Sequence, residues 1–220
     1  MIQFEDVTKT FPDTGVTALS HVNFHILPGQ MTFILGQSGS GKTTLLRLLL
    51  RELTADTGRV WVNGQNIGSL KNRNVPAYRR KIGFVFQDFK LLREHTVFEN
   101  VAIVKRVSGA KERDILSQVT MALRVVGMEA AFYKPVTSLS GGEQQKVCIA
   151  RAIVGNPHCI LADEPTGNLD PKQAREIMLL LEQINGLGIT TLIATHDREA
   201  IRDMDYPRLY LRDGILENGE

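Results

Sequence analysis

The amino-acid sequence predicts one α/β domain over residues 1–220, with an antiparallel β subdomain near its start and an all-helical subdomain inserted into the α/β core. Apolar and polar residues roughly alternate over residues 2–11, which is typical of strands with one solvated face. Mainly apolar runs at residues 31–35 and 158–162 indicate buried strands, the second of them parallel. Residues 88 to about 155 follow helical periodicity instead, so we place the helical subdomain there.

Length, charge and composition exclude several classes of protein. A chain of 220 residues suits one α/β unit with a smaller subdomain better than two independent domains. Its net charge of +2 lacks the basic excess of a dedicated nucleic-acid binder, so no nucleic-acid partner is expected. No stretch approaches the ~18 apolar residues of a membrane span, and the acidic N-terminus lacks a secretory signal. We therefore expect a cytosolic protein whose membrane role needs a partner, with Cys148 and Cys159 as small core residues in a reducing compartment.

The first predicted elements are strands joined by turns. Val22, Phe24 and Ile26 repeat the alternation, and a turn at residues 12–15 lies beside Phe11. A later strand at residues 59–62 ends in Asn63-Gly64, a hairpin-type turn.

Residues 36–43 follow an apolar run and precede a helix, and they fit the phosphate-binding pattern G-x-x-x-x-G-K-[ST] in its required context. The glycines let successive N–H groups turn toward phosphate oxygens, and the helix adds its positive end. Lys42 would neutralise the β- and γ-phosphates and Thr43 would bind Mg²⁺, which predicts a nucleoside triphosphate site. Without ligand, we expect Lys42 to face solvent. The predicted nucleotide-binding residues here are Gly36, Gln37, Ser38, Gly39, Ser40, Gly41, Lys42, Thr43 and Thr44. The alternative is a Gly/Ser-rich turn without a ligand, which eight fitting positions in context argue against.

Further elements follow along the chain. The apolar run at residues 82–86 reads as a buried strand that ends at Gln87, and Thr96 with Glu99 forms a capping box that opens a helix. Asp170-Pro171 is an N-cap followed by Pro at the first helical position. Residues 190–194 and 209–211 are predicted as the last strands.

Two carboxylates follow the strand predicted at 158–162. Strand ends of this kind lie beside the phosphate loop in a parallel sheet, so Asp163 is placed to hold Mg²⁺ and Glu164 to orient or deprotonate the attacking water. Without a phosphate loop, an ordinary turn or helix-capping pair would be the better interpretation. Gln87 ends another strand, where its side-chain carbonyl could reach Mg²⁺ or the water while its backbone hinges the two subdomains.

Two further features admit alternative interpretations. His196 directly follows the strand at 190–194; a lone His there is usually polar surface, but this strand is expected to end near the nucleotide. Ser140-Gly141-Gly142-Glu143 fits a capping box, and its two bare glycines at a helix start also suit an anion site. For residues 140–143, spacing alone does not decide between a capping box and an anion site.

Together these residues resemble the ATP-binding subunit of ABC transporters over essentially the whole chain. The family's Walker A, Q-loop, signature, Walker B, D-loop and H-loop motifs match, in order, residues 36–43, Gln87, residues 139–144, residues 160–164, residues 168–170 and His196. The resemblance implies a P-loop NTPase core that hydrolyses ATP to ADP and phosphate with Mg²⁺. Its catalytic residues would be Glu164, His196, which would contact the γ-phosphate, and Gln87.

The resemblance also implies a head-to-tail homodimer that holds each ATP between one subunit's Walker A and the other's signature. Ser140, Gly141 and Gly142 would then contact the partner's nucleotide, and Phe11 would stack on adenine. The family more often has Tyr at that position, so Phe11 keeps the aromatic face and loses the hydroxyl.

Within the family, the chain looks most like the ATPase of the bacterial cell-division complex, at residues 75–76, 79–80, 82–83, 86–88, 90–92 and 96–102. This implies an integral membrane subunit as partner and a place on the cytoplasmic face of the cell membrane. ATPases of lipoprotein release and macrolide export share residues 141–145 and 163–170 and stay as alternatives. The chain departs from the subfamily at Lys146, usually Arg, and at residues 104–106, usually apolar. The second departure lies in the insert used against the membrane partner and leaves the details of that contact open.

Two other classes fit less well. DNA-repair ATPases with such a signature separate it from Walker A by a long coiled coil, whereas Lys42 and Ser140 are only about a hundred residues apart with no sustained heptads. Solute-importer subunits often add a regulatory domain, and this sequence ends at Glu220.

Overall fold

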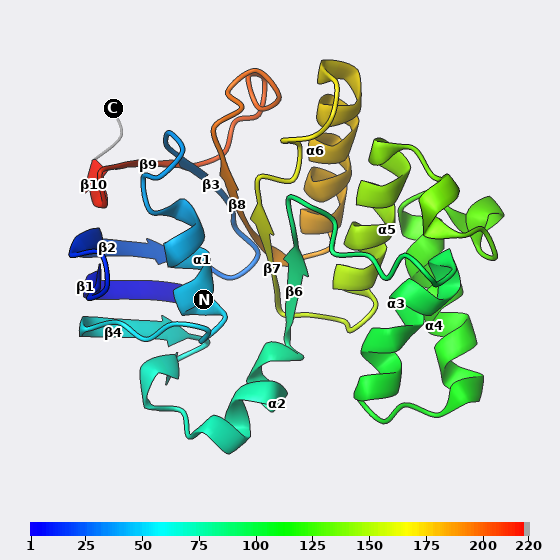
Figure 1. Cartoon of the computed structure of the whole chain (residues 1–220), viewed down its shortest axis with the longest axis horizontal. Helices are drawn as coiled ribbons and strands as arrows, with labels where there is room; N and C mark the ends of the chain where they lie inside the picture. Colours follow the sequence, from blue (N-terminus) through cyan, green and yellow to red (C-terminus); the bar gives the residue numbers. More distant parts are fainter. Residues whose placement is uncertain (218–220) are drawn as a thin grey trace.

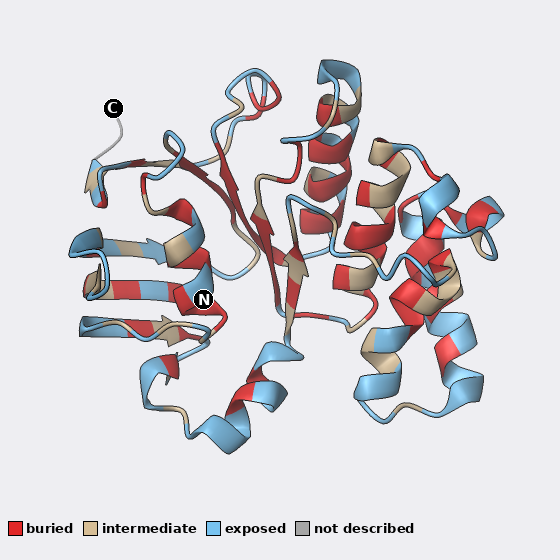
Figure 2. Cartoon of the chain, in the orientation of Figure 1, coloured by how far each residue is buried: buried red, intermediate tan, exposed pale blue. Residues whose placement is uncertain are grey.

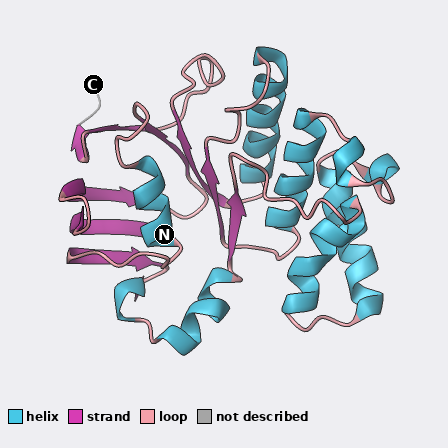
Figure 3. Ribbon diagram, in the orientation of Figure 1, coloured by secondary structure: helices cyan, strands magenta, loops and turns pink. Residues whose placement is uncertain are grey.

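The computed structural model describes residues 1–217, so residues 218–220 of the predicted domain lie outside the described residues. The strands form two sheets, one in the order β2-β1-β4-β5 and one in the order β10-β9-β3-β8-β7-β6. Figures 1 and 3 show the small sheet on one side, the large sheet in the centre and most of the helices on the other side. This arrangement is the mixed α/β architecture with a β subdomain and a helical part that the sequence predicts.

The small sheet is antiparallel, and short turns join β1 to β2 and β4 to β5, whereas β3 and α1 intervene in the chain between β2 and β4. Strand β1 pairs with β2 on one side and with β4 on the other. In the turn between β1 and β2, the amides of Thr14 and Gly15 donate hydrogen bonds to the carbonyl of Phe11, which places Phe11 at the tip of this hairpin. The strands are β1 (Ile2–Phe11), β2 (Val16–Ile26), β4 (Thr57–Val62) and β5 (Gln65–Asn66).

The large sheet is parallel apart from its edge strand β10, and its register decides where the functional residues meet. Leu35 pairs with Thr195, and Asp163 pairs with Ala194. The carboxyl ends of three central strands therefore meet at one edge, and the segments that begin at Gly36, Glu164 and His196 leave the sheet side by side. The strands are β3 (Met31–Leu35), β6 (Ile82–Val85), β7 (Cys159–Asp163), β8 (Thr190–Thr195), β9 (Arg208–Arg212) and β10 (Ile215–Glu217).

Two hydrophobic cores lie on the two faces of the large sheet. Along β3, Phe33 is buried in the core that contains helices α3 to α6, whereas Ile34 is buried in the core shared with α1 and the small sheet. The central strands β3 and β8 are buried along their whole length (Figure 2), as expected for a sheet covered on both faces. The helices are α1 (Lys42–Leu49), α2 (Val75–Arg79), α3 (Val97–Val107), α4 (Glu112–Val125), α5 (Gly141–Ile153) and α6 (Pro171–Asn185).

The predicted helix starts are confirmed. Thr96 caps α3 and forms a reciprocal capping box with Glu99, and Ser140 forms the same box with Glu143 at α5. The carboxylate of Asp170 accepts a hydrogen bond of 2.9 Å from the backbone of Gln173 in α6. Side chains thus satisfy N–H groups that have no partner inside their own helices.

Helix length also bears on how the chain meets a membrane. Within residues 1–217, no helix combines the length and the apolar character that crossing a membrane requires. Helix α2 was not predicted from the sequence. The bounds 88–155 of the helical subdomain stay a prediction.

Candidate functional site

The phosphate-binding loop connects β3 to α1, and its backbone needs glycine at defined positions. Gly41 has a φ of 105°, which L-residues rarely adopt, and a Cβ there would lie 2.3 Å from the carbonyl oxygen of Ala18. A Cβ on Gly36 would lie 2.3 Å from the carbonyl oxygen of Leu211. Larger residues would therefore force the loop away from β2 and β9, so packing alone already requires glycine at these two positions.

Lys42 does not face solvent, and this expectation was wrong. The residue is 5 % exposed, and its ammonium donates to the carbonyls of Gly36 at 2.6 Å and Gln37 at 3.0 Å. It also lies 3.2 Å from Oε1 of Glu164. Burying a polar group without a hydrogen-bond partner costs about 2–7 kcal/mol, and burying an unpaired charge costs more. The Lys42 side chain therefore folds back onto the oxygens of its own loop and of Glu164.

Thr43 and Asp163 come together from α1 and β7. The Thr43 hydroxyl donates to Oδ1 of Asp163 at 3.2 Å. Burial raises the pKa of the Asp163 carboxyl above its ordinary value, and the nearby charge of Glu164 also raises it, while the Thr43 hydrogen bond and Lys42 oppose the shift. A partly desolvated carboxylate beside a hydroxyl is a pair of hard oxygen donors, the kind that Mg²⁺ prefers.

Glu164 is held in one orientation by its own backbone and by His196. Its φ is 46°, in the left-handed region, and its N–H donates to the carbonyl of Ala194 at 2.8 Å. Oε2 accepts from the backbone N–H of His196 at 3.1 Å and lies 2.9 Å from Nδ1 of the same residue. The carboxylate side chain is 12 % exposed, so its two oxygens are fixed between His196 and Lys42.

A cavity of about 530 Å³ contains many of the predicted site residues, and its volume suits a small-molecule ligand. Phe11 and Val16 of the β1–β2 hairpin line one part of it. The predicted residues that line it are Phe11, Ser38, Gly39, Gly41, Lys42, Thr43, Thr44, Gln87, Glu164 and His196.

Ser140 and Gly142 lie outside this cavity. They line a separate pocket together with Glu143, Lys146 and the start of α6. Ser140 makes its full capping box with Glu143, so the capping interpretation is correct as far as it goes. One chain alone does not bring these residues to the phosphate loop, and the interpretation as an anion site stays a prediction.

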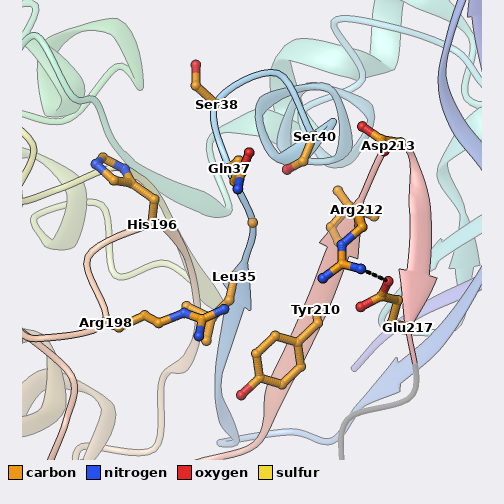
Figure 4. A pocket seen from close by; sticks show the side chains of 12 residues that line it. Leu35, Gln37, Ser38, Ser40, His196, Arg198, Tyr210, Arg212, Asp213 and Glu217 are labelled. Atoms are coloured by element: carbon orange, nitrogen blue, oxygen red, sulfur yellow. Dashed lines mark ion pairs between the residues drawn. The ribbon is translucent and has the colours of Figure 1, made fainter.

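Sequence reasoning missed a second cavity of about 470 Å³ beside the phosphate loop (Figure 4). Gln37, Ser38 and His196 line it together with strands β9 and β10. In it, the Arg198 guanidinium lies 5.9 Å from the centre of the Tyr210 ring. The sequence could have indicated Arg198, because it lies two residues after the predicted site residue His196. It could not have indicated Tyr210, because the position of that residue depends on the pairing of β9 with β3.

The chain is similar to known proteins over its full length. The family profile described as "ABC transporter" matches residues 19–167. The cell division ATP-binding proteins FtsE of Escherichia coli K12 and of Streptococcus pneumoniae D39 are 47 % and 44 % identical over 220 residues, which is 100 % of this chain and 98 % and 95 % of theirs.

Solved structures agree with the sequence comparison. The dimeric structure of the bacterial ABC transporter cassette MJ0796 superposes with a TM-score of 0.89 at 35 % identity, covering 100 % of this chain and 98 % of that one. The same cassette in a post-hydrolysis state bound to ADP and Pi superposes with a TM-score of 0.88 at 34 % identity, over the same shares of the two chains. These likenesses confirm the predicted fold class. The residues around the phosphate loop and the match along the chain lead to one conclusion, that the protein belongs to the ABC transporter family.

Proposed function

We propose that this chain is the ATP-binding and ATP-hydrolysing subunit of a membrane complex that acts in bacterial cell division. Its partner would be an integral membrane subunit similar to FtsX, which it would meet on the cytoplasmic face of the membrane. The observation that carries the proposal is the cluster of Lys42, Thr43, Asp163, Glu164 and His196 at one sheet edge, in a chain 42–47 % identical to FtsE proteins over 220 residues.

The nucleotide would bind in the cavity of about 530 Å³. The Phe11 ring, at the tip of the hairpin, would stack on adenine, and the amides of the phosphate loop would receive the phosphates. Lys42 already has carbonyl partners in Gly36 and Gln37. ATP therefore needs to replace only the contact between Lys42 and Glu164. The phosphates would then neutralise the positive charge of the Lys42 ammonium in place of Glu164.

Mg²⁺ fits the donor set beside the loop. The Thr43 hydroxyl lies 3.2 Å from the Asp163 carboxylate, and Gln87 lines the cavity that Thr43 also lines. We assign these three residues to the ion. Held by these residues, Mg²⁺ would supply positive charge that stabilises the negative charge developing on the phosphates during hydrolysis.

Glu164 would position the attacking water. Once Lys42 turns to the phosphates, Oε1 is free to accept a hydrogen bond from water, while His196 keeps Oε2 in place. Hydrolysis depends mainly on a positioned nucleophile, so a fixed carboxylate that accepts the water proton suits the reaction. His196 would donate through Nδ1 to Glu164, and a doubly protonated ring would also donate through Nε2 to the γ-phosphate.

The active form would be a head-to-tail homodimer. Ser140 and Gly142 line a pocket away from the phosphate loop, so they would reach an ATP bound by the partner rather than by their own chain. The superposition on a dimeric cassette supports this arrangement. Each site would then contain the signature residues Ser140, Gly141 and Gly142 of the second copy.

Replacing Lys42 with Ala should weaken ATP binding by about ten- to a hundredfold, as expected for losing a hydrogen-bonded charge. Because Lys42 is buried, the change should also lower the unfolding midpoint by about 2–4 °C, since Glu164 and two carbonyls lose their partner. Calorimetric titration and thermal unfolding measure the two effects. Lys81→Ala, at an exposed site, is the control. Undiminished ATP affinity would show that the loop does not hold phosphates.

Reversing the charge at Arg93 should separate membrane recruitment from ATP binding. Arg93 is exposed in the segment before α3, whereas Lys90 is already paired with Asp88 at 2.6 Å. Arg93→Glu should lower co-purification with the membrane subunit from solubilised membranes by about tenfold, the effect of about 1.4 kcal/mol. ATP affinity should stay unchanged. Arg59→Glu, on the small sheet, is the matched control, and equal loss of both properties would place Arg93 in the core or at the nucleotide.

A further inference from the structure

The segment that connects Gln87 to α3 is held by side chains instead of by regular secondary structure. Its backbone forms no helix or strand between residues 87 and 96. Side chains supply the missing partners: Asn168 donates to the carbonyl of Gln87 at 3.0 Å, and the buried Asn100 holds both the N–H and the carbonyl of Leu92, at 2.7 and 3.1 Å. The two ends of this linker are therefore fixed by different parts of the molecule.

The middle of the linker is strained. Phe89 and Lys90 have φ values of 59° and 50°, so two consecutive residues with a Cβ lie in the left-handed region. The Lys90 N–H donates to the carbonyl of Asp88 at 2.6 Å, which closes a tight γ-turn around Phe89. Such conformations cost on the order of 1–3 kcal/mol each and persist only where surrounding contacts over-determine them.

Helix α5 supplies those contacts. Two nitrogens of the Arg151 guanidinium donate to the carbonyls of Lys90 and Phe89, each at 2.6 Å, and the Cys148 thiol donates to the carbonyl of Phe89 at 3.0 Å. Cys148 is fully buried. Burial lowers the pKa of Arg151 from its ordinary value, and no carboxylate pairs with it among residues 1–217, so the two carbonyls are its main compensation.

The same helix begins at Ser140. Arg151 and the N-cap of α5 therefore belong to one rigid element of 13 helical residues, with the candidate signature at one end and the linker clamp at the other. Gln87 lies two residues before Phe89 and lines the nucleotide cavity. A movement of α5 must then either carry the linker with it or break the fork of Arg151.

We propose that Arg151 is a positioning residue: its guanidinium fork on the carbonyls of Phe89 and Lys90, aided by Cys148, sets the place of Gln87 in the nucleotide cavity and ties it to the helix that begins at Ser140. This inference rests on the proposed role of Gln87 in hydrolysis. The guanidinium holds the two carbonyls through two nitrogens of one rigid plane, a fixed geometry that a lysine ammonium, a point charge on a flexible stem, does not reproduce at this site.

The test is a double-mutant cycle on the full chain. Arg151→Lys keeps the charge but removes the fork, so kcat for ATP hydrolysis should fall about tenfold while the ATP Kd changes less than about twofold. In a Gln87→Ala background the same substitution should change kcat less than about twofold, because the residue through which it acts is gone. Arg124→Lys, on exposed α4, is the matched control and should leave kcat and Kd unchanged.

Each outcome decides a separate point. If Gln87→Ala alone leaves kcat unchanged, the proposed role of Gln87 fails and the inference fails with it. If Gln87→Ala lowers kcat but Arg151→Lys has its full effect in that background, only the positioning inference is overturned. An unchanged kcat in Arg151→Lys overturns it too.

A second pair of variants, at Cys148, tests the clamp independently in case Arg151→Lys does not fold. Cys148→Ala removes the thiol donor, whereas Cys148→Ser keeps a donor to the Phe89 carbonyl. Amide hydrogen exchange of residues 88–92 should speed up several-fold in Cys148→Ala, stay near the original rate in Cys148→Ser and be unaltered in α1 in both. Equal exchange of residues 88–92 in the two variants contradicts the clamp.

Discussion

Glu164→Gln is expected to slow ATP hydrolysis by about 10²–10⁴-fold, the usual contribution of a positioned acid or base, while ATP binds more tightly. Glu164 now lies 3.2 Å from Lys42, so its charge competes with the phosphates for the ammonium. The amide keeps the shape and a carbonyl for His196 but gives up that charge. Phosphate release and calorimetric titration measure the two effects, which should have opposite signs.

The control for this change is an exposed carboxylate. Glu129→Gln removes the same charge from the Arg124 pair and should alter neither quantity. If Glu164→Gln hydrolysed ATP at the original rate, the water would be positioned by another group. If binding weakened instead, the contact between Glu164 and Lys42 would support the nucleotide site rather than compete for it.

The second large effect concerns association. In the Glu164→Gln background, ATP should convert monomer into a dimer that accumulates because hydrolysis no longer opens it. Adding Ser140→Arg places a long side chain where the partner's γ-phosphate belongs, so the double variant should bind ATP and stay monomeric. Light scattering with and without ATP gives the mass directly.

The chain itself provides a matched control for the capping role of Ser140. Thr96 forms the same reciprocal capping box at α3, with Glu99 in place of Glu143. Thr96→Arg and Ser140→Arg should each cost roughly 1 kcal/mol of stability through the lost cap. Only Ser140→Arg should abolish the ATP-dependent dimer. Dimerisation of the Glu164→Gln, Ser140→Arg variant would reduce Ser140 to a helix cap and refute the shared site.

Most of the fold was accessible to sequence analysis because its signals are local. A helix cap involves residues three apart, as at Thr96 and Asp170, and both caps are present as predicted. Alternation over residues 2–11 and the turn beside Phe11 likewise involve neighbouring residues, and they form the β1–β2 hairpin. Of the residues singled out by a family motif or a strand end, Gln87, Glu164 and His196 line the cavity of about 530 Å³, whereas Ser140 and Gly142 line a separate pocket.

Predictions that depended on distant contacts were less complete. We expected Lys42 in solvent, on the ground that a phosphate-loop lysine is largely solvent-facing without ligand. Its ammonium instead lies 3.2 Å from Glu164, more than a hundred residues later in the chain. Arg151 lies within the predicted helical subdomain, and the sequence gave it no role of its own. Nothing local indicates that its side chain contacts the carbonyls of Phe89 and Lys90. Tyr210 was predicted as strand alone.

The sequence by itself determined the α/β class, the helix starts, the phosphate-binding loop and the carboxylates that follow β7, because each depends on residue type and spacing over a few positions. Only the tertiary structure decided the ionic partner of Lys42, the orientation of Glu164 between Lys42 and His196, and the clamp of α5 on the linker after Gln87. The physical reason is that burial obliges each of these groups to find an oxygen or nitrogen partner, and strand register and helix packing decide which one lies within reach.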